Sequence, residues 1–187
     1  MIERRHPGYF DMPEEAVWER AQTVSLVAVD VDGVLTDGSV YLGAEGEMLK
    51  SFHIHDGKGL RLLSDAGLAV AWISARSSPA LEYRARELGI VDLIQGCPDK
   101  GAALAELCRH KGLAPDRAAF VGDDLVDLGA MARAGLAVAV ADAHPAVRAR
   151  AHWVTARPGG RGAVREVCEL VLAAHGLLDD LIEGHDR

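Results

Sequence analysis

The chain has 187 residues and a net charge of −8, from 20 basic and 28 acidic side chains, and 49% of its residues are hydrophobic. These values are typical of one globular domain and exclude a disordered tail, a fibre and a coiled coil. The sequence contains no basic stripe, so we expect no nucleic-acid partner. No apolar run approaches the roughly 20 residues of a membrane helix, so we expect no membrane partner.

The N-terminal residues and the cysteines favour a cytoplasmic location. Residues 1–7 (MIERRHP) carry charges with no apolar segment behind them, so no secretory signal is expected. Cys97, Cys108 and Cys168 are odd in number and too far apart for a paired-cysteine metal motif. This usage is typical of reduced, buried thiols in a cytoplasmic protein.

Three regions are expected along the chain. Residues 1–23 are interpreted as an arm with one short helix, because Pro13 is followed by acidic Glu14 at a helix start. Residues 24–176 are interpreted as the main domain, and residues 177–187 as a C-terminal tail.

A β-hairpin is predicted over residues 38–54, with its turn in the segment 43–46 (GAEG). In this reading Met48, Phe52 and Ile54 share one face of a strand. Such a hairpin either folds onto its own domain or meets other subunits, and the sequence leaves both readings open.

The rest of the chain alternates strands and helices. Short apolar runs that lack polar alternation predict buried strands at residues 24–29, 68–73, 91–94, 118–121 and 136–140. Helical spacing predicts helices at residues 57–66, 79–88, 99–111, 124–134 and 164–175, with Asp99 as an N-cap. The expected fold class is therefore α/β, a doubly wound, mostly parallel Rossmann-like sheet with the hairpin inserted after the first strand.

In such sheets ligands bind beyond the carboxyl ends of the strands. The polar residues expected at those ends are Asp30, Asp32, Ser74, Lys100, Asp123, Asp124 and Asp127. Two carboxylates about 4 Å apart repel by roughly 4 kcal/mol at an effective dielectric constant of 20, so the cluster needs a cation. Oxygen ligands favour Mg²⁺, and a cation beside Lys100 would attract a phosphate ester.

Asp30 and Asp32 are two positions apart at a strand end, so on the strand they share a face. One carboxylate can attack phosphorus and form an aspartyl-phosphate. The other can sit at the leaving oxygen as general acid.

These residues fall within motifs of a known family. Residues 30–38 (DVDGVLTDG) resemble the first motif of the haloacid dehalogenase-like phosphatases. Ser74, Lys100 and residues 122–127 (GDDLVD) fall where the second, third and fourth motifs should. The resemblance covers roughly residues 24–176 and has four motifs in order.

Three further segments resemble one subfamily, the phosphatases for 3-deoxy-D-manno-octulosonate 8-phosphate (KDO 8-phosphate). They are residues 56–61 (DGKGLR), 138–145 (VAVADAHP) and 159–166 (GGRGAVRE). The resemblance implies a magnesium-dependent, cytoplasmic homotetramer in lipopolysaccharide sugar synthesis.

The resemblance also implies catalytic roles. Asp30 is expected to be the nucleophile and Asp32 the general acid and base. Ser74 is expected to hydrogen-bond the phosphoryl group, and Lys100 to balance its charge.

For the metal, the resemblance implies the carboxylates of Asp30 and Asp123 and the backbone carbonyl of Asp32. Asp127 is expected to orient Lys100 or a water at the metal.

The sugar acid needs cations for its carboxylate, and arginine pairs with carboxylates in a bidentate manner. The residues expected to bind substrate are Asp32, His53, His55, Asp56, Gly57, Arg61, Arg76, Arg84, Lys100, Asp124 and Arg161.

The sequence departs from the family pattern in two places. Residues 74–76 read SAR where TGR is usual, which keeps the hydroxyl but loses a glycine. Residues 53–56 read HIHD where NVRD is typical, which removes an arginine from the expected sugar site.

No lid domain fits between residues 37 and 74 or between residues 74 and 100. Water exclusion must then come from elsewhere. We expect the glycine-rich segment around Arg161 of one subunit to cover the site of a neighbour.

Three alternatives remain. The substrate could be a nine-carbon sugar acid 9-phosphate. A signalling receiver domain would place its phosphorylated aspartate at the middle strand, where Ser74 stands. A non-catalytic regulatory module would not need the full set Asp30, Asp32, Lys100 and Asp123.

Overall fold

The computed structural model describes residue 10, residues 13–44 and residues 46–185. A six-stranded sheet forms its centre, and every neighbouring pair of strands is parallel. The strand order is β5-β4-β1-β6-β7-β8. Their bounds are β1 Leu26–Val29, β4 Ala69–Ile73, β5 Asp92–Ile94, β6 Ala118–Gly122, β7 Leu136–Ala139 and β8 Trp153–Val154. The order confirms the doubly wound fold predicted from the sequence.

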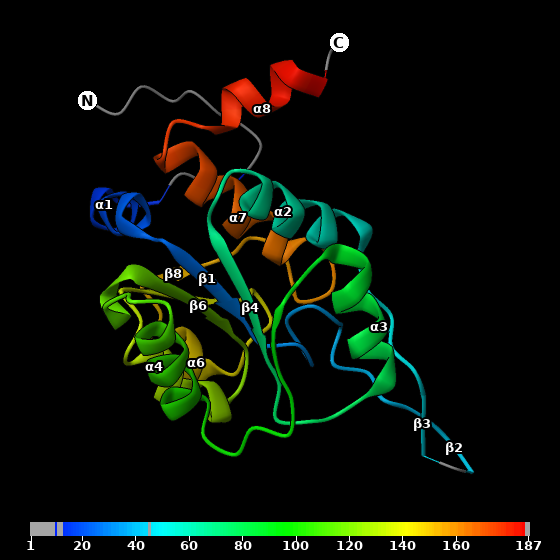
Figure 1. The fold of residues 1–187 in the computed structure, drawn as a ribbon. Coiled ribbons are helices and arrows are strands. Elements are labelled where there is room, and N and C mark those ends of the chain that lie inside the picture. Colours follow the sequence, from blue (N-terminus) through cyan, green and yellow to red (C-terminus); the bar gives the residue numbers. More distant parts are fainter. Residues whose placement is uncertain (1–9, 11–12, 45, 186–187) are drawn as a thin grey trace.

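Helices cover both faces of the sheet (Figure 1). Helices α1, α2 and α7 pack together on one side, and α4 packs with α5 on the other. The helices are α1 Glu15–Thr23, α2 Ile54–Asp65, α3 Pro79–Leu88, α4 Lys100–His110, α5 Leu128–Met131, α6 Pro145–Arg148, α7 Ala163–Ala174 and α8 Leu178–His185, with 3-10 turns at Pro115–Arg117 and Leu125–Asp127. Within the described ranges, no helix combines the length and the apolar character that a bilayer span requires.

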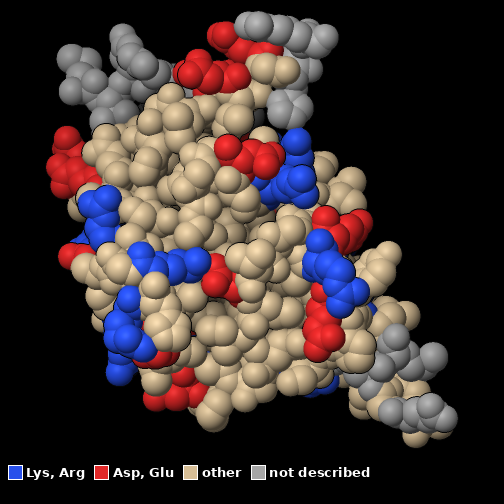
Figure 2. All heavy atoms as spheres, in the orientation of Figure 1, with Lys and Arg blue, Asp and Glu red and all other residues tan. Residues whose placement is uncertain are grey.

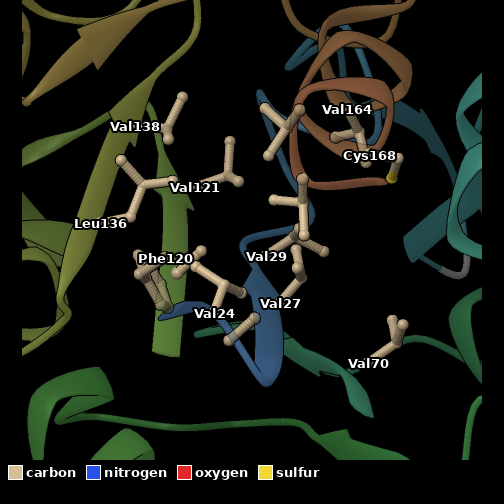
Figure 3. Packing of buried hydrophobic residues seen from close by; sticks show 14 of the residues in the cluster. Val24, Val27, Val29, Val70, Phe120, Val121, Leu136, Val138, Val164 and Cys168 are labelled. Carbon is tan, nitrogen blue, oxygen red and sulfur yellow. The ribbon is translucent and has the colours of Figure 1, made fainter. Parts of the chain in front are cut away.

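One layer of the hydrophobic core lies between the sheet and helix α7 (Figure 3). Register pairs Val29 with Val121, and Val121 with Val138, so these three side chains share one face of the sheet. Val164 and Cys168 of α7 face them, and all five are fully buried. Burial of a side chain of this size stabilises the fold by about 1.5–3 kcal/mol, so this layer fixes the strand ends firmly.

The hairpin is shorter than predicted. Strands β2 (Tyr41–Gly43) and β3 (Gly46–Leu49) form it, and it projects from the body of the molecule (Figure 1). Ile54 is not in a strand but begins α2, because the side chain of His53 caps this helix by accepting from His55 N at 3.3 Å. Phe52 stacks instead on Trp72, with 6.3 Å between ring centroids.

Other boundaries differ for local reasons. The helix predicted over residues 124–134 is a 3-10 turn followed by α5, because Asp124 and Asp127 form a capping box around the turn. Asp99 caps α4 as predicted, accepting from Ala102 N at 2.9 Å. Three short elements were not predicted, namely α6, β8 and α8.

Candidate active site

The loop after β1 holds the first pair of aspartates. Asp30 N donates to Val121 O at 2.9 Å, which extends the strand pairing by one residue. Gly33 has a φ of +102° and lies against the carboxylate of Asp123, where a Cβ would overlap the carboxylate oxygens. Only glycine fits this position, because both the backbone conformation and the close approach exclude a side chain.

Lys100 lies at the centre of the acidic cluster. Its side chain is 2% exposed, and its Nζ lies 2.5 Å from Asp30 Oδ1 and 2.6 Å from Asp127 Oδ1. Lys100 is the first residue of α4, so the Asp99 cap fixes the backbone from which it extends. The predicted convergence of the first, third and fourth motifs is therefore present in the structure.

Asp127 is a fully buried acceptor rather than a free carboxylate. Its Oδ2 accepts from Asp123 N at 2.9 Å and from Asp124 N at 3.2 Å, while its Oδ1 accepts from Lys100. These bonds hold the turn that carries Asp123 and orient the lysine. They match the role of orienting Lys100 that was expected for Asp127.

Burial and mutual repulsion perturb the protonation of this cluster. Burial, followed by the charge of Asp127, raises the pKa of Asp30 to about 6, against the opposing effect of Lys100. Burial, followed by the charges of Asp30 and Asp127, raises the pKa of Asp123 to about 8. Burial alone would lower the pKa of Lys100, but Asp30 and Asp127 outweigh it and raise that pKa. The site carries more negative charge than one lysine balances.

The cluster fits a divalent cation. Carboxylate oxygens of Asp30, Asp123 and Asp127 lie within 4.8 Å of one another. Asp123 Oδ1 is buried and has no hydrogen-bond partner among the described residues, which is costly unless an ion or water contacts it. Because both oxygens of Asp127 already accept hydrogen bonds, Asp30 and Asp123 are the carboxylates suited to hold Mg²⁺.

The side chain of Asp32 turns away from the acidic cluster. Its Oδ2 accepts from Ser74 Oγ at 3.4 Å, and its Oδ1 forms an ion pair with Lys50. Ser74 Oγ in turn accepts from Arg76 N at 3.1 Å. The two aspartates of the first motif thus face different partners, and their expected roles as nucleophile and as general acid and base stay predictions. The predicted contact of the Asp32 carbonyl with metal stays a prediction.

Lys50 was not predicted as a site residue. It follows β3 in the hairpin, and its side chain is 2% exposed. Nothing in the local sequence separates it from an ordinary solvated lysine, because its burial depends on the packing of the hairpin root against the loop after β1.

A narrow crevice beside the site contains several residues expected to bind the sugar. His53, Asp56, Gly57 and Arg84 line it together with Leu35, Phe52, Trp72 and Leu88. Arg84 also pairs with Glu87 at 2.6 Å. The indole nitrogen of Trp72 is buried and has no hydrogen-bond partner within the described part of the chain.

Asp56 differs from the expected sugar contact. It is 1% exposed, and its carboxylate accepts from Gly162 N at 3.2 Å and from Arg165 N at 2.8 Å. Burial raises its pKa, against the effect of these two bonds. Asp56 therefore ties α2 to the N-terminus of α7.

The glycine-rich segment packs on its own chain. Gly160 N donates to Val34 O at 2.9 Å, and a Cβ on Gly159 would overlap the carbonyl of Gly33. Arg161 is exposed, and its guanidinium nitrogen Nη2 lies 3.6 Å from Oδ2 of Asp37, in the loop after β1. Gly159 and Gly160 thus brace the loop after β1 within one subunit. The expectation that the segment around Arg161 covers a neighbouring site stays a prediction.

Four of the predicted substrate residues lie outside the crevice. Arg61 is exposed beside Asp65, with Nε 3.6 Å from Oδ1 of the acid. Arg76 is exposed after β4, and Asp124 is exposed and caps the turn through Leu125 N at 2.7 Å. His55 is exposed and packs edge-on against His53. Their substrate contacts stay predictions.

The chain belongs to the haloacid dehalogenase-like hydrolases, because the model of that family matches residues 62–165. A relative from Salmonella typhi, named 3-deoxy-D-manno-octulosonate 8-phosphate phosphatase KdsC, is 48% identical over 164 residues, which are 88% of this chain and 87% of the relative. The resemblance stated from the motifs is confirmed.

Two solved structures of similarly named proteins share the fold. The phosphatase from Yersinia pestis has a TM-score of 0.86 and 48% identity, covering 88% of this chain and 89% of its own. The phosphatase from Moraxella catarrhalis, in complex with magnesium, phosphate and KDO, has a TM-score of 0.88 and 41% identity, covering 90% of this chain and 97% of its own.

Proposed function

We propose that this protein is a Mg²⁺-dependent phosphatase that hydrolyses KDO 8-phosphate to KDO and phosphate, in lipopolysaccharide sugar synthesis. The observation that carries the reaction class is the buried Lys100, which pairs with Asp30 and Asp127. Beside it lies Asp123 Oδ1, a buried oxygen that no hydrogen-bond donor of the described ranges contacts. The names of the relatives, and the KDO bound to one of them, support the sugar.

In the proposed reaction Asp30 attacks phosphorus in line with the sugar oxygen. The bond between phosphorus and that oxygen breaks, and Asp32 gives the oxygen a proton. Asp32 then takes a proton from water, which attacks phosphorus and breaks the bond to Asp30. Lys100 and Ser74 hold the phosphoryl oxygens throughout. Magnesium, when bound by Asp30, Asp123 and the Asp32 carbonyl, supplies positive charge that offsets the charge of the phosphoryl group.

The sugar is proposed to lie over the crevice of His53, Gly57 and Arg84, where Arg84 offers a cation to its carboxylate. Arg61, Arg76 and Arg161 are further candidates at the rim. A nine-carbon sugar acid 9-phosphate is the second candidate substrate, because His55 stands where an arginine is typical of the KDO 8-phosphate enzymes.

A substrate panel tests this assignment. Phosphate release from KDO 8-phosphate and from nine-carbon sugar acid 9-phosphates is measured with Mg²⁺ and again with EDTA. We expect kcat/KM for KDO 8-phosphate to be at least tenfold higher, since a site built for one polar ligand rejects others on this scale or beyond. A preference for the nine-carbon esters would make them the substrates in place of KDO 8-phosphate. Phosphate release that persists in EDTA would contradict the dependence on a metal.

The proposed assembly is a homotetramer built with the hairpin. Val40, Tyr41, Leu42 and Leu49 are large apolar side chains that are 40–71% exposed, and the hairpin stands away from the body of the subunit (Figure 1). Exposed apolar groups at one place favour contact with another copy. Light scattering should give four times the chain mass, and Leu42→Glu should lower it. A monomeric unmodified chain would overturn this proposal.

A cytoplasmic location is proposed from the cysteines, since Cys97, Cys108 and Cys168 are all free and buried. On the face shown in Figure 2, basic and acidic side chains are interspersed, which offers no broad basic patch to nucleic acid there. Fractionation of cells should recover the protein with cytoplasmic markers.

A further inference from the structure

Lys50 connects the hairpin to the catalytic loop. It follows β3 directly, yet its side chain is 2% exposed and its ammonium group pairs with Asp32 Oδ1. Burying an ammonium group is costly unless a partner compensates it. The hairpin root therefore keeps this lysine at a defined place beside the loop of the first motif.

The two aspartates of that loop are each held by a different lysine. Asp30 Oδ1 lies 2.5 Å from Lys100 Nζ, whereas Asp32 pairs with Lys50 and accepts from Ser74. The donors on Asp32 come from two separate elements, the hairpin root and the end of β4. Together they fix both carboxylate oxygens and keep the side chain apart from the Asp30–Lys100 pair.

We propose that Lys50 is a positioning residue that holds Asp32 in the orientation from which it serves the leaving oxygen and the attacking water. The inference rests on the proposed phosphatase function and deepens it. A displacement of about 1 Å in a proton-transfer group costs on the order of 100-fold in rate, so removal of one of the two donors should be measurable.

A purely structural lysine would have different consequences. Loss of hairpin packing alone would slow every substrate in the same proportion. Loss of Asp32 positioning would slow the steps that need proton transfer and spare a step that needs none. p-Nitrophenyl phosphate separates the two, because its leaving group departs without protonation while the later attack of water still requires Asp32.

The experiment compares Lys50→Met, Lys50→Arg and the unmodified protein, each with saturating Mg²⁺. For Lys50→Met we expect kcat on KDO 8-phosphate to fall on the order of 100-fold, with KM changed less than threefold. With p-nitrophenyl phosphate the same variant should release a burst of about one p-nitrophenolate per site and then turn over slowly. Lys50→Arg should keep at least about a tenth of the kcat of the unmodified protein.

Lys111→Met is the matched control, because Lys111 Nζ lies 2.6 Å from Asp92 at the far end of α4, in a partly buried lysine–aspartate pair. It should leave kcat unchanged. Calorimetry should give Mg²⁺ affinities within twofold of the unmodified protein for both methionine variants.

A double-mutant cycle with Asp32→Asn decides the outcome. If Lys50 acts through Asp32, Lys50→Met has no further effect in the Asp32→Asn background. Independent losses, or an equal loss on both substrates without a burst, would overturn the inference. Should Lys50→Met not fold, Lys50→Gln takes its place in the p-nitrophenyl phosphate assay and in the cycle. An unmodified chain that releases no phosphate from any ester overturns the phosphatase proposal instead.

Discussion

Asp56 Oδ2 accepts a hydrogen bond from Gly162 N at 3.2 Å, which joins positions 106 residues apart in the sequence. The acid is on α2, and the glycine precedes α7, so this bond fastens the two helices that cover one face of the sheet. It also fixes the glycine-rich segment that braces the catalytic loop.

Asp56→Ala should therefore destabilise the protein by about 3 kcal/mol, because buried N–H groups lose their acceptor at about 1–3 kcal/mol each. For a chain of this size the thermal midpoint should fall by roughly 6–12 °C. Denaturant unfolding measures the change. Asp65→Ala, at the exposed end of α2, is the control and should stay within about 0.5 kcal/mol. A stable Asp56→Ala protein with only a raised KM would restore the sugar-binding role.

Asp30→Asn should abolish turnover with the fold intact. The amide cannot attack phosphorus, so phosphate release should drop at least ~10³-fold. Burial raises the pKa of Asp30 to about 6. At pH 8 the carboxylate is ionised, and its charge lowers the free energy of unfolding of the metal-free protein. The variant's thermal midpoint without Mg²⁺ at pH 8 should equal or exceed that of the unmodified protein. Normal turnover by this variant would exclude the aspartyl-phosphate.

Stability of the metal-free protein should fall as pH rises from about 4 to about 8. In this window Asp123, with its pKa raised to about 8, keeps a proton in the folded state that the unfolded chain has lost. The folded state binds more protons, so the free energy of unfolding decreases with pH. Thermal melting at pH 5, 6.5 and 8 in EDTA checks the sign, and a rise in stability would contradict it.

Mg²⁺ should reverse that trend, because it replaces the protons on Asp30 and Asp123. At a free concentration one hundred times its Kd, a ligand stabilises by about 2.7 kcal/mol, or roughly 5–10 °C here. The shift should be larger at pH 8 than at pH 5, where protons compete. An equal shift at both values would mean that the ion binds elsewhere.

Gly159→Ala should impair catalysis strongly, although the substitution adds only one methyl group. The added Cβ would overlap the carbonyl of Gly33, in the loop between Asp32 and Asp37. The loop must move, so kcat should fall at least tenfold and stability by about 1–3 kcal/mol. Gly184→Ala is the control, since a Cβ there meets nothing within 4 Å. If both alanine variants behave alike, the brace has no effect on the catalytic loop.

The sequence predicted the convergence of Asp30, Lys100 and Asp123 because the signals for it are local. Asp30, Ser74 and Asp123 each follow an apolar strand, and a parallel sheet brings strand ends together whatever the detailed packing. Asp99 is a recognisable N-cap, which predicted the start of α4 and therefore the position of Lys100.

The contacts that support the cluster depend on packing between distant segments. The buried Lys50, just after the hairpin, pairs with Asp32 of the loop after β1, and Gly159 lies against Gly33, more than a hundred residues away in the sequence. Asp56 was predicted to contact the sugar, but its carboxylate oxygens accept hydrogen bonds from Gly162 N and Arg165 N at the start of α7. A pattern along the chain does not reveal which partner occupies a carboxylate.

The brace formed by Gly159 and Gly160 also constrains when the site can form during synthesis. The ribosome makes the loop of Asp30 and Asp32 well before it makes this brace and the helix α7 that follows. A nascent chain therefore contains Asp30 and Asp32 before it contains Gly159 and Gly160, which hold the loop of these aspartates in place. The loop can therefore take its final shape only after Gly159 and Gly160 have been made and have packed against it.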